Sequence, residues 1–215
     1  MTEIFVLAVE NILKMETLLE KPRTYYSYEE FVKLTEDLLA ENKTTGTNHS
    51  EAYLDYTRLN LQRMNRVYKT TKINEDLKEK MTSIQGRYQF LVLVEAWCGD
   101  VPQNFPVLAK IAELSDNIEL RGILRDENLD IMDSYLAYGG RGIPKLIIFE
   151  QDSKTVVGEW GPRPFPAQKM VLDYKAIEGD KPAYSEFVKT VQMWYAKDRT
   201  QTLQREILEL LKALA

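Results

Sequence analysis

Cys98 is the only cysteine of the chain and the residue best suited to covalent chemistry. A cysteine reacts as its thiolate, and a helix N-terminus lowers the pKa of a thiol from its usual value of about 8.5. Before Cys98, the residues from Phe90 to Val94 form an unbroken apolar run, and helical spacing of apolar residues begins after Asp100. The sequence therefore predicts that Cys98 lies in a turn from a buried strand into a helix, where free backbone N–H groups face outward.

Opposing electrostatic effects act on the predicted Cys98 thiolate. The helix dipole favours the thiolate by about 0.3–1 kcal/mol, and hydrogen bonds from backbone N–H groups add to this. The carboxylate of Asp100, on the order of 6 Å away, disfavours it by roughly 0.7 kcal/mol in water and about 3 kcal/mol at an effective dielectric constant of about 20. Because these effects are similar in size, the sequence leaves the pKa of Cys98 open. Asp100 has a structural alternative as the helix cap.

The secondary-structure pattern around this turn changes along the chain, from helices alone to alternating strands and helices. The first 85 residues carry helical patterns only, with a capping box at Ser27 to Glu30 and further helices at 50–70 and 75–84. From Arg87 onward, strands and helices alternate, which is typical of a mixed sheet with helices on its faces. After the central strand the pattern predicts a helix to about 115, a strand at 118–124, a helix at 127–138, strands at 145–149 and 155–160, and helices at 167–177 and 185–214.

The Trp97-Cys98-Gly99 turn, Pro106 and the Arg141-Gly142-Ile143-Pro144 loop together resemble the thioredoxin family over about residues 87–180. That family has Trp-Cys-Gly-Pro-Cys after a strand, a proline eight residues past the first cysteine, and a Gly-Ile-Pro loop with a cis peptide bond. The resemblance implies an α/β fold, a thioredoxin-like mixed β-sheet flanked by helices, here with an added N-terminal helical layer and a long C-terminal helix. Thr45-Gly46 and the stretch from Tyr56 to Met64 also resemble a bacterial branch with a Trp-Cys-Gly-Asp motif.

The resemblance implies a set of site residues. Cys98 would be the catalytic residue, and the substrate would contact the following side chains and backbone groups: Trp97, Gly99, Asp100, Ile143 and Pro144. The departures from the family pattern affect function most. Val101 stands where the second, resolving cysteine would be, Val92 stands in place of the buried aspartate that accepts a proton, and Asp100 replaces the proline between the cysteines.

These residues lead to competing functional hypotheses. The first is a redox protein that performs monothiol exchange, in which Cys98 attacks a protein disulfide or a low-molecular-weight thiol adduct and an external thiol finishes the cycle. This hypothesis requires a Cys98 pKa below the usual value. The second is a non-catalytic binding or scaffolding module, favoured by Val92 and Val101, with the added helices as a surface for a partner or a second copy. Ligation of an iron–sulfur cluster is a third, and Asp100 disfavours it. We expect no cofactor and no metal.

Other polar and aromatic residues have structural interpretations. His49 is a lone histidine in a polar loop with no metal-ligand pattern nearby. Helical spacing favours core packing for Tyr53, Tyr56 and Met64, and a solvated helix face for Arg58, Arg63 and Arg66. Arg141 and Arg163 flank the loops closest to Cys98 and are candidates for holding an anion.

Composition restricts the function class further. The net charge of −5 gives no electrostatic basis for binding nucleic acid or an anionic membrane surface. A single cysteine suits a reducing compartment, and the N-terminus lacks the features of a signal peptide, so we expect a cytoplasmic protein. The expected organisation is a helical extension at 1–85, a thioredoxin-like domain at 86–180 and a C-terminal helix at 181–215. Apolar residues at helical spacing predict a helix at 2–20, and whether residues 1–26 are native sequence stays open.

Overall fold

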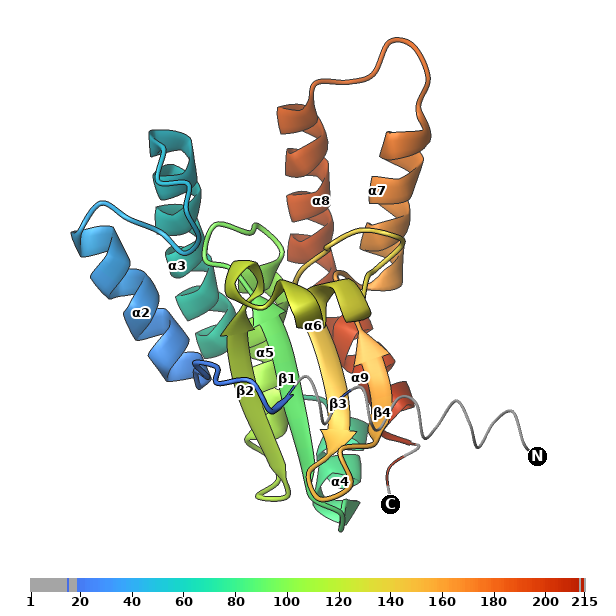
Figure 1. The fold of residues 1–215 in the computed structure, drawn as a ribbon. Coiled ribbons are helices and arrows are strands. Elements are labelled where there is room, and N and C mark those ends of the chain that lie inside the picture. The colour runs from blue at the N-terminus through green and yellow to red at the C-terminus, as the bar shows by residue number, and fades with distance from the viewer. Residues whose placement is uncertain (1–14, 16–18, 213, 215) are drawn as a thin grey trace.

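The computed structural model describes residue 15, residues 19–212 and residue 214, and its centre is a four-stranded sheet in the order β2-β1-β3-β4 (Figure 1). The central strand β1 (Tyr88–Val94) pairs in parallel with β2 (Ile118–Leu124) and antiparallel with β3 (Lys145–Glu150). The edge strand β4 (Val156–Trp160) pairs antiparallel with β3. All side chains from Phe90 to Val94 are fully buried, which explains the unbroken apolar run as a strand covered on both faces.

Helices cover both faces of this sheet. Behind it lies α5 (Val101–Ala112), which follows β1 directly, and α6 (Leu129–Ser134) lies in front (Figure 1). The N-terminal layer consists of α2 (Tyr28–Ala40), α3 (Glu51–Thr70) and α4 (Glu75–Ser83), and α3 packs along α5. The mixed α/β fold class, with N-terminal helices added to a flanked sheet, is therefore confirmed.

The capping box predicted at the start of α2 is present. The Ser27 hydroxyl accepts from the backbone N–H of Glu30 at 3.2 Å, and the Glu30 carboxylate accepts from the backbone N–H of Ser27 at 2.7 Å. Two backbone donors at the helix start are thereby satisfied, which fixes where α2 begins. The predicted helix at 2–20 lies almost wholly outside the described residues. No helix in the described part of the chain combines the length and the apolar character needed to cross a bilayer.

The predicted helix at 127–138 is shorter than expected. A 3₁₀ turn at Arg125–Glu127 precedes α6, and α6 ends at Ser134 because Tyr135 leaves the helical conformation with φ −132° and ψ 46°. Leu136 therefore lies outside α6 and is exposed, as is Leu129, whereas Met132 and Tyr135 are buried.

The C-terminal helix is present but divided. After α7 (Phe165–Ala176), the chain forms α8 (Tyr184–Asp198) and then α9 (Gln201–Leu211), in place of one helix over 185–214. Arg199 and Thr200 separate the two helices with φ angles of 50° and 68°, a left-handed conformation that a continuous helix excludes. This break lets α9 pack beside α4 and β4 while α7 and α8 project beyond the sheet, at the end where α3 also projects (Figure 1).

The apolar residues of α3 do not all enter the core. Met64 is fully buried, but Tyr56 is 45% exposed and Leu59 is 41% exposed, so the prediction of core packing is wrong for Tyr56. Tyr56 and Leu59 lie at the edge of the buried stripe of α3 that includes Leu54, Asn60 and Met64.

Candidate functional site

Cys98 lies where the sequence predicts, in the turn between β1 and α5. The residue is half-buried, and its Sγ donates a hydrogen bond to the backbone carbonyl of Ile143 at 3.4 Å. Ile143 and Pro144 are joined by a cis peptide bond. The structure therefore brings together the cysteine turn and the proline loop, which are separated in the sequence by α5, β2 and α6.

The environment of Cys98 raises the pKa of its thiol to about 11. Burial is the largest cause, and the Asp100 carboxylate acts in the same direction. Backbone N–H groups of Asp100 and Val101 and the positive charge of Arg163 act the other way, without offsetting burial. Cys98 is therefore a protonated hydrogen-bond donor at neutral pH, which is the opposite of what the redox hypothesis requires.

Asp100 is buried and makes contacts that its position alone does not reveal. Its Oδ2 forms an ion pair with Nη2 of Arg163 at 2.5 Å, and its Oδ1 accepts from the hydroxyl of Tyr195 at 3.0 Å. Asp100 occupies the N-cap position of α5, as the sequence alternative proposed, but its side chain makes no capping hydrogen bond there. Burial raises the pKa of Asp100, while Arg163 and Tyr195 act to lower it.

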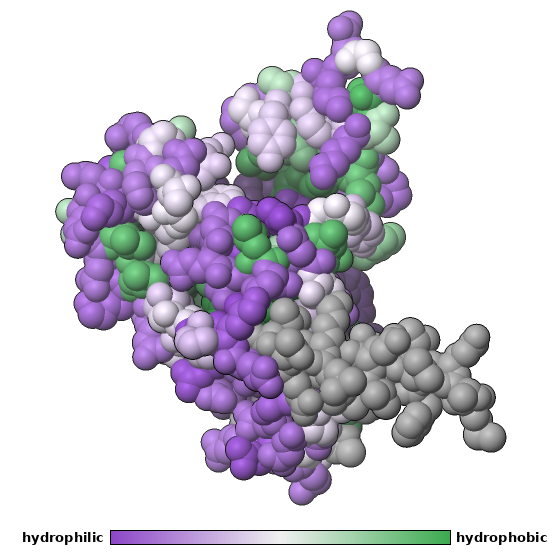
Figure 2. All heavy atoms as spheres, in the orientation of Figure 1, coloured by the Kyte–Doolittle hydropathy of each residue, from purple (hydrophilic) through white to green (hydrophobic). Residues whose placement is uncertain are grey.

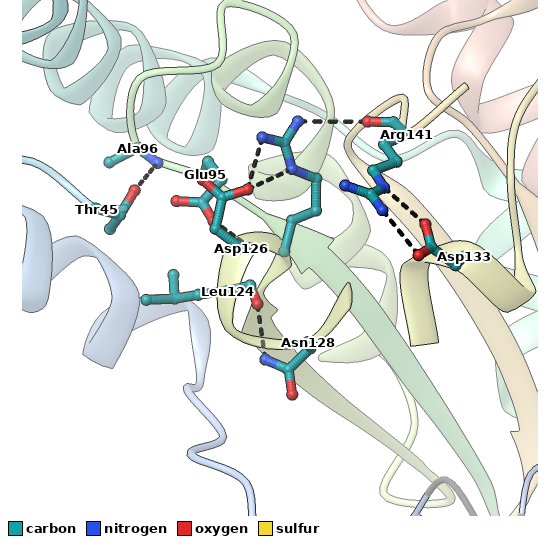
Figure 3. Close-up of polar contacts among 9 residues, drawn as sticks. Thr45, Glu95, Ala96, Leu124, Asp126, Asn128, Asp133 and Arg141 are labelled. Carbon is teal, nitrogen blue, oxygen red and sulfur yellow. Dashed lines mark hydrogen bonds and ion pairs between the residues drawn. The ribbon is translucent and has the colours of Figure 1, made fainter. Parts of the chain in front are cut away.

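Both arginines proposed as anion ligands are paired with carboxylates of the chain itself. Arg163 is paired with Asp100, and Arg141 binds the carboxylate of Asp133 through two nitrogens at 2.6 and 2.8 Å (Figure 3). The ion pair of Arg163 instead fastens the loop between β4 and α7 onto the start of α5.

Helix α8 is fastened to the same turn. The Gln192 side chain donates to the carbonyl of Gly99 at 3.3 Å and accepts from Gln103 at 2.8 Å. One turn further along α8, the Tyr195 hydroxyl accepts from Asn104 at 3.1 Å. These bonds, together with Asp100, hold α8 against the first turn of α5.

Helix α3 and the loop before it hold the other side of the turn. The buried side chain of Asn60 donates to the carbonyls of Ala96 and Cys98 at 2.9 and 3.1 Å. The hydroxyl of Thr45 accepts from the N–H of Ala96 at 2.9 Å (Figure 3). Asn60 from α3 and Thr45 from the loop before α3 therefore position the cysteine turn.

Trp97 lies between an aromatic ring and a cation. Its ring is 5.4 Å from that of Tyr53, measured between centroids, and the Arg125 guanidinium lies 4.8 Å from the Trp97 ring centroid. Next to it, the buried carboxylate of Glu95 accepts from the N–H of Asp126 at 2.9 Å (Figure 3), and burial raises the pKa of Glu95. No group of three or more ligating side chains within the described residues could hold a metal ion.

The loop that contains Pro144 is covered. Ile143 and Pro144 are both buried, and the loop after β4 lies directly on them. A Cβ added to Gly161 would lie 2.2 Å from the Pro144 carbonyl oxygen, so this position requires glycine. Of the residues predicted to contact a substrate, only Trp97, Cys98 and Gly99 are partly exposed, because Asp100, Ile143 and Pro144 are buried.

A surface hollow lies elsewhere on the described part of the chain. It has a volume of about 660 Å³ and is lined by residues from Ser27 to Gln151, including Arg87, Asn117 and Glu119. These residues lie near the starts of β1 and β2, whereas Cys98 follows the end of β1. This hollow is therefore at the opposite end of the sheet from the cysteine turn.

Comparisons with known proteins agree with this geometry. A thioredoxin family model matches residues 46–178, which is more than half of the chain. The chain belongs to the thioredoxin family. A comparison with curated proteins finds no match. Among solved structures, a protein of unknown function from Pseudomonas aeruginosa is similar, with 19% identity, a TM-score of 0.52, and coverage of 87% of this chain and 98% of that one. An HIV epitope-scaffold has the same identity and TM-score, covering 88% of this chain and all of its own. At this identity the likeness shows the fold alone.

As a thioredoxin-family protein, this chain lacks polar groups at two positions where the family pattern has them. Val101 and Val92 are both fully buried among apolar side chains, so neither a second thiol nor a carboxylate assists Cys98 from these positions. Sequence reasoning assigned no role at the site to Asn60, Gln192 or Tyr195. Only Asn60 lies in a stretch that the sequence analysis singled out, from Tyr56 to Met64. Gln192 and Tyr195 had no such indication, because the contacts of α8 depend on how distant elements pack.

Proposed function

We propose that this thioredoxin-family protein is a non-catalytic binding module that holds a segment of a partner protein over the turn Trp97–Gly99. The observation that carries this proposal is the setting of the Cys98 thiol, which is half-buried and donates a hydrogen bond to the Ile143 carbonyl. Burial there raises the pKa of the thiol to about 11. At neutral pH only roughly one such thiol in ten thousand would be ionised. A nucleophile for disulfide exchange needs a far larger thiolate fraction.

The neighbours of Cys98 support the same conclusion. Val92 and Val101 offer neither a base nor a resolving thiol, and the Asp100 carboxylate disfavours the thiolate. The polar contacts of the turn hold its backbone in place instead. Asn60, Gln192 and the Asp100–Arg163 pair each tie it to a different element. A rigid surface of this kind lowers the entropy cost of binding a partner.

The test is the rate of Cys98 alkylation by a thiol-specific reagent as a function of pH. Because the chain has one cysteine, the signal has one source. We expect the rate to rise tenfold per pH unit up to at least pH 10, with a midpoint near the pKa of about 11. A midpoint below the reference value of about 8.5 would refute the proposal and restore a reactive thiolate.

A second candidate is monothiol disulfide exchange, and one arrangement favours it. Cys98 is only half-buried beside Ile143, and the charge of Arg163 acts to lower the pKa of its thiol. In this reaction the Cys98 thiolate attacks a disulfide, forms a mixed disulfide, and releases the second sulfur as a thiol. An external thiol must then reduce the mixed disulfide. Incubation with a small oxidised thiol at pH 7.5, followed by mass measurement, distinguishes the candidates, because only this one predicts an adduct that is absent from Cys98→Ser.

A further inference from the structure

The surface above the cysteine turn is a cleft between two projecting helices. Figure 2 shows the molecule hollowed between the side formed by α2 and α3 and the side formed by α7 and α8. We define the α3–α8 cleft by residues of these elements that are partly or fully exposed: Cys98 and Gly99 of the turn, Tyr56, Leu59 and Arg63 of α3, and Tyr184 of α8.

The two walls face each other across the turn. Tyr184 belongs to the same face of α8 as Val191 and Tyr195, which are buried against the body, but Tyr184 lies beyond the body and is 67% exposed. Its hydroxyl is within electrostatic range of Cys98 and of Tyr56 on α3. The Tyr184 ring also lies beside those of Tyr174 and Phe187, with centroids 6.2 and 6.3 Å away. Together with Tyr56 and Leu59 on the α3 wall, Tyr184 still leaves apolar area exposed on both sides.

Arg63 adds a charge to the α3 wall. Arg63 lies about one turn after Leu59 and two turns after Tyr56 on the same flank of α3. Tyr56 is close enough to raise the pKa of Arg63. Nη1 of Arg63 is 3.4 Å from the Asn60 side chain, which itself bonds the Cys98 carbonyl. Arg63 is half-buried, and in the described part of the chain no carboxylate pairs with it.

The neighbouring Arg58 shows how an arginine of α3 is normally neutralised. It binds the carboxylates of Glu51 and Asp55, each at 2.8 Å. A half-buried guanidinium without such a partner retains strong donors for a carboxylate. Leaving it unpaired costs stability, and a ligand carboxylate would remove that cost.

We propose that the α3–α8 cleft binds an acidic-apolar polypeptide segment, whose carboxylate pairs with Arg63 and whose apolar side chains pack between Tyr56 and Tyr184. The inference rests on the proposed binding function and names the chemistry of the partner. A nucleic acid is a poor alternative, since Arg63 and the nearby Arg66 are few charges for a polyanion and the net charge of −5 repels it.

The experiment selects binders from a phage library of random dodecapeptides against the full-length protein and measures the best peptide by fluorescence anisotropy. We expect selected sequences to be rich in Asp or Glu beside apolar residues. Arg63→Gln should weaken binding roughly 10- to 100-fold, the usual effect of removing a hydrogen bond between charged groups. The matched control Arg58→Gln should change the affinity less than about twofold, because Arg58 is already paired.

A double-mutant cycle makes the assignment specific. Replacing the acidic residue of the peptide by its amide should weaken binding to the wild type and to Arg58→Gln, but not further to Arg63→Gln. Arg63→Lys keeps the charge and controls for misfolding, and melting curves verify that each variant is folded.

The possible outcomes distinguish a failure of the proposed binding function from a failure of the assignment of Arg63. If the wild type selects no peptide above background, the binding function fails, and this inference fails with it. If peptides bind but lack acidic residues, or bind Arg63→Gln equally well, only the assignment of Arg63 is overturned. If light scattering shows a dimer that Tyr56→Ala converts to a monomer, a second copy covers the cleft and the proposal is also overturned.

Discussion

Replacing Asp100 by asparagine should make Cys98 more reactive, although it breaks the buried ion pair between Asp100 and Arg163. The Asp100 carboxylate is the second largest cause, after burial, of the raised pKa of Cys98. In the wild type this carboxylate also offsets the charge of Arg163, with which it pairs at 2.5 Å. Asp100→Asn therefore removes a negative charge near the sulfur and frees a positive one, and both changes favour the thiolate.

The size of the effect follows from the charges and their separation. For side chains on the order of 6 Å apart, removing the carboxylate stabilises the thiolate by roughly 0.7 to 3 kcal/mol as the effective dielectric constant varies from about 80 to 20. That corresponds to a decrease of about 0.5 to 2 units in the pKa of Cys98. A thiolate of lower pKa is also a weaker nucleophile, with a Brønsted coefficient of about 0.45. The net expected gain in alkylation rate at pH 8 is therefore roughly 2- to 12-fold.

The assay is second-order alkylation by iodoacetamide at pH 8, under conditions where circular dichroism shows the variant to be folded. Unfolding is a concern because breaking one side of a buried ion pair costs about 3–5 kcal/mol. The double variant Asp100→Asn with Arg163→Gln avoids an unpaired guanidinium and should still react faster than the wild type. Asp133→Asn is the matched control, since it breaks the exposed pair with Arg141 and should leave the rate unchanged. A folded Asp100→Asn protein that reacts no faster than the wild type would refute the electrostatic reasoning.

Two further changes test the packing around the turn and the acid dependence of stability. Asn60→Leu leaves the carbonyls of Ala96 and Cys98 without their donor, and it should lower the free energy of unfolding in urea by about 2–4 kcal/mol. The exposed control Asn65→Leu should change it by less than about 0.5 kcal/mol; equal losses would contradict the role of Asn60. Hydrogen bonds from Arg23 and Lys21 hold the pKa of Asp130 far below its usual range. A carboxyl with a depressed folded pKa stabilises the protein above its unfolded pKa of about 3.9, and this stabilisation is lost as the pH falls. Wild type should therefore lose more stability than Asp130→Asn between pH 6 and pH 2, and parallel profiles would rule this out.

Local sequence signals predicted much of the fold. The apolar run from Phe90 to Val94 identified the central strand because a strand buried on both faces has no room for polar residues. The capping box at Ser27 identified the start of α2 because it needs only residues three apart. The break between α8 and α9 was missed, since Arg199 and Thr200 are ordinary helix residues in sequence and take their left-handed conformation from packing around them.

The candidate site was predictable only in part, for a similar reason. The position of Cys98 at a helix start followed from local pattern, but the sign of its pKa shift depends on burial, which the surrounding elements create. Likewise, no local pattern indicates that Asp100 turns toward Arg163 and Tyr195 and away from its own helix. The contacts that decide the chemistry are long-range, and a single sequence gives little information about them.

The helices added to the sheet explain why the Cys98 thiol has a raised pKa and restricted access. Asn60 from α3 and Gln192 from α8 both bond carbonyls of the turn, so the same helices that form the cleft walls also fix its floor. A thiol that must attack a substrate needs access and an ionised sulfur, and this arrangement reduces both. A surface that must recognise a partner needs fixed geometry, which these bonds provide at the point where Tyr56 and Tyr184 leave apolar area exposed. Loss of the second cysteine is then consistent with the same change of role, because Val101 adds to the buried packing that holds α5 in place under the cleft.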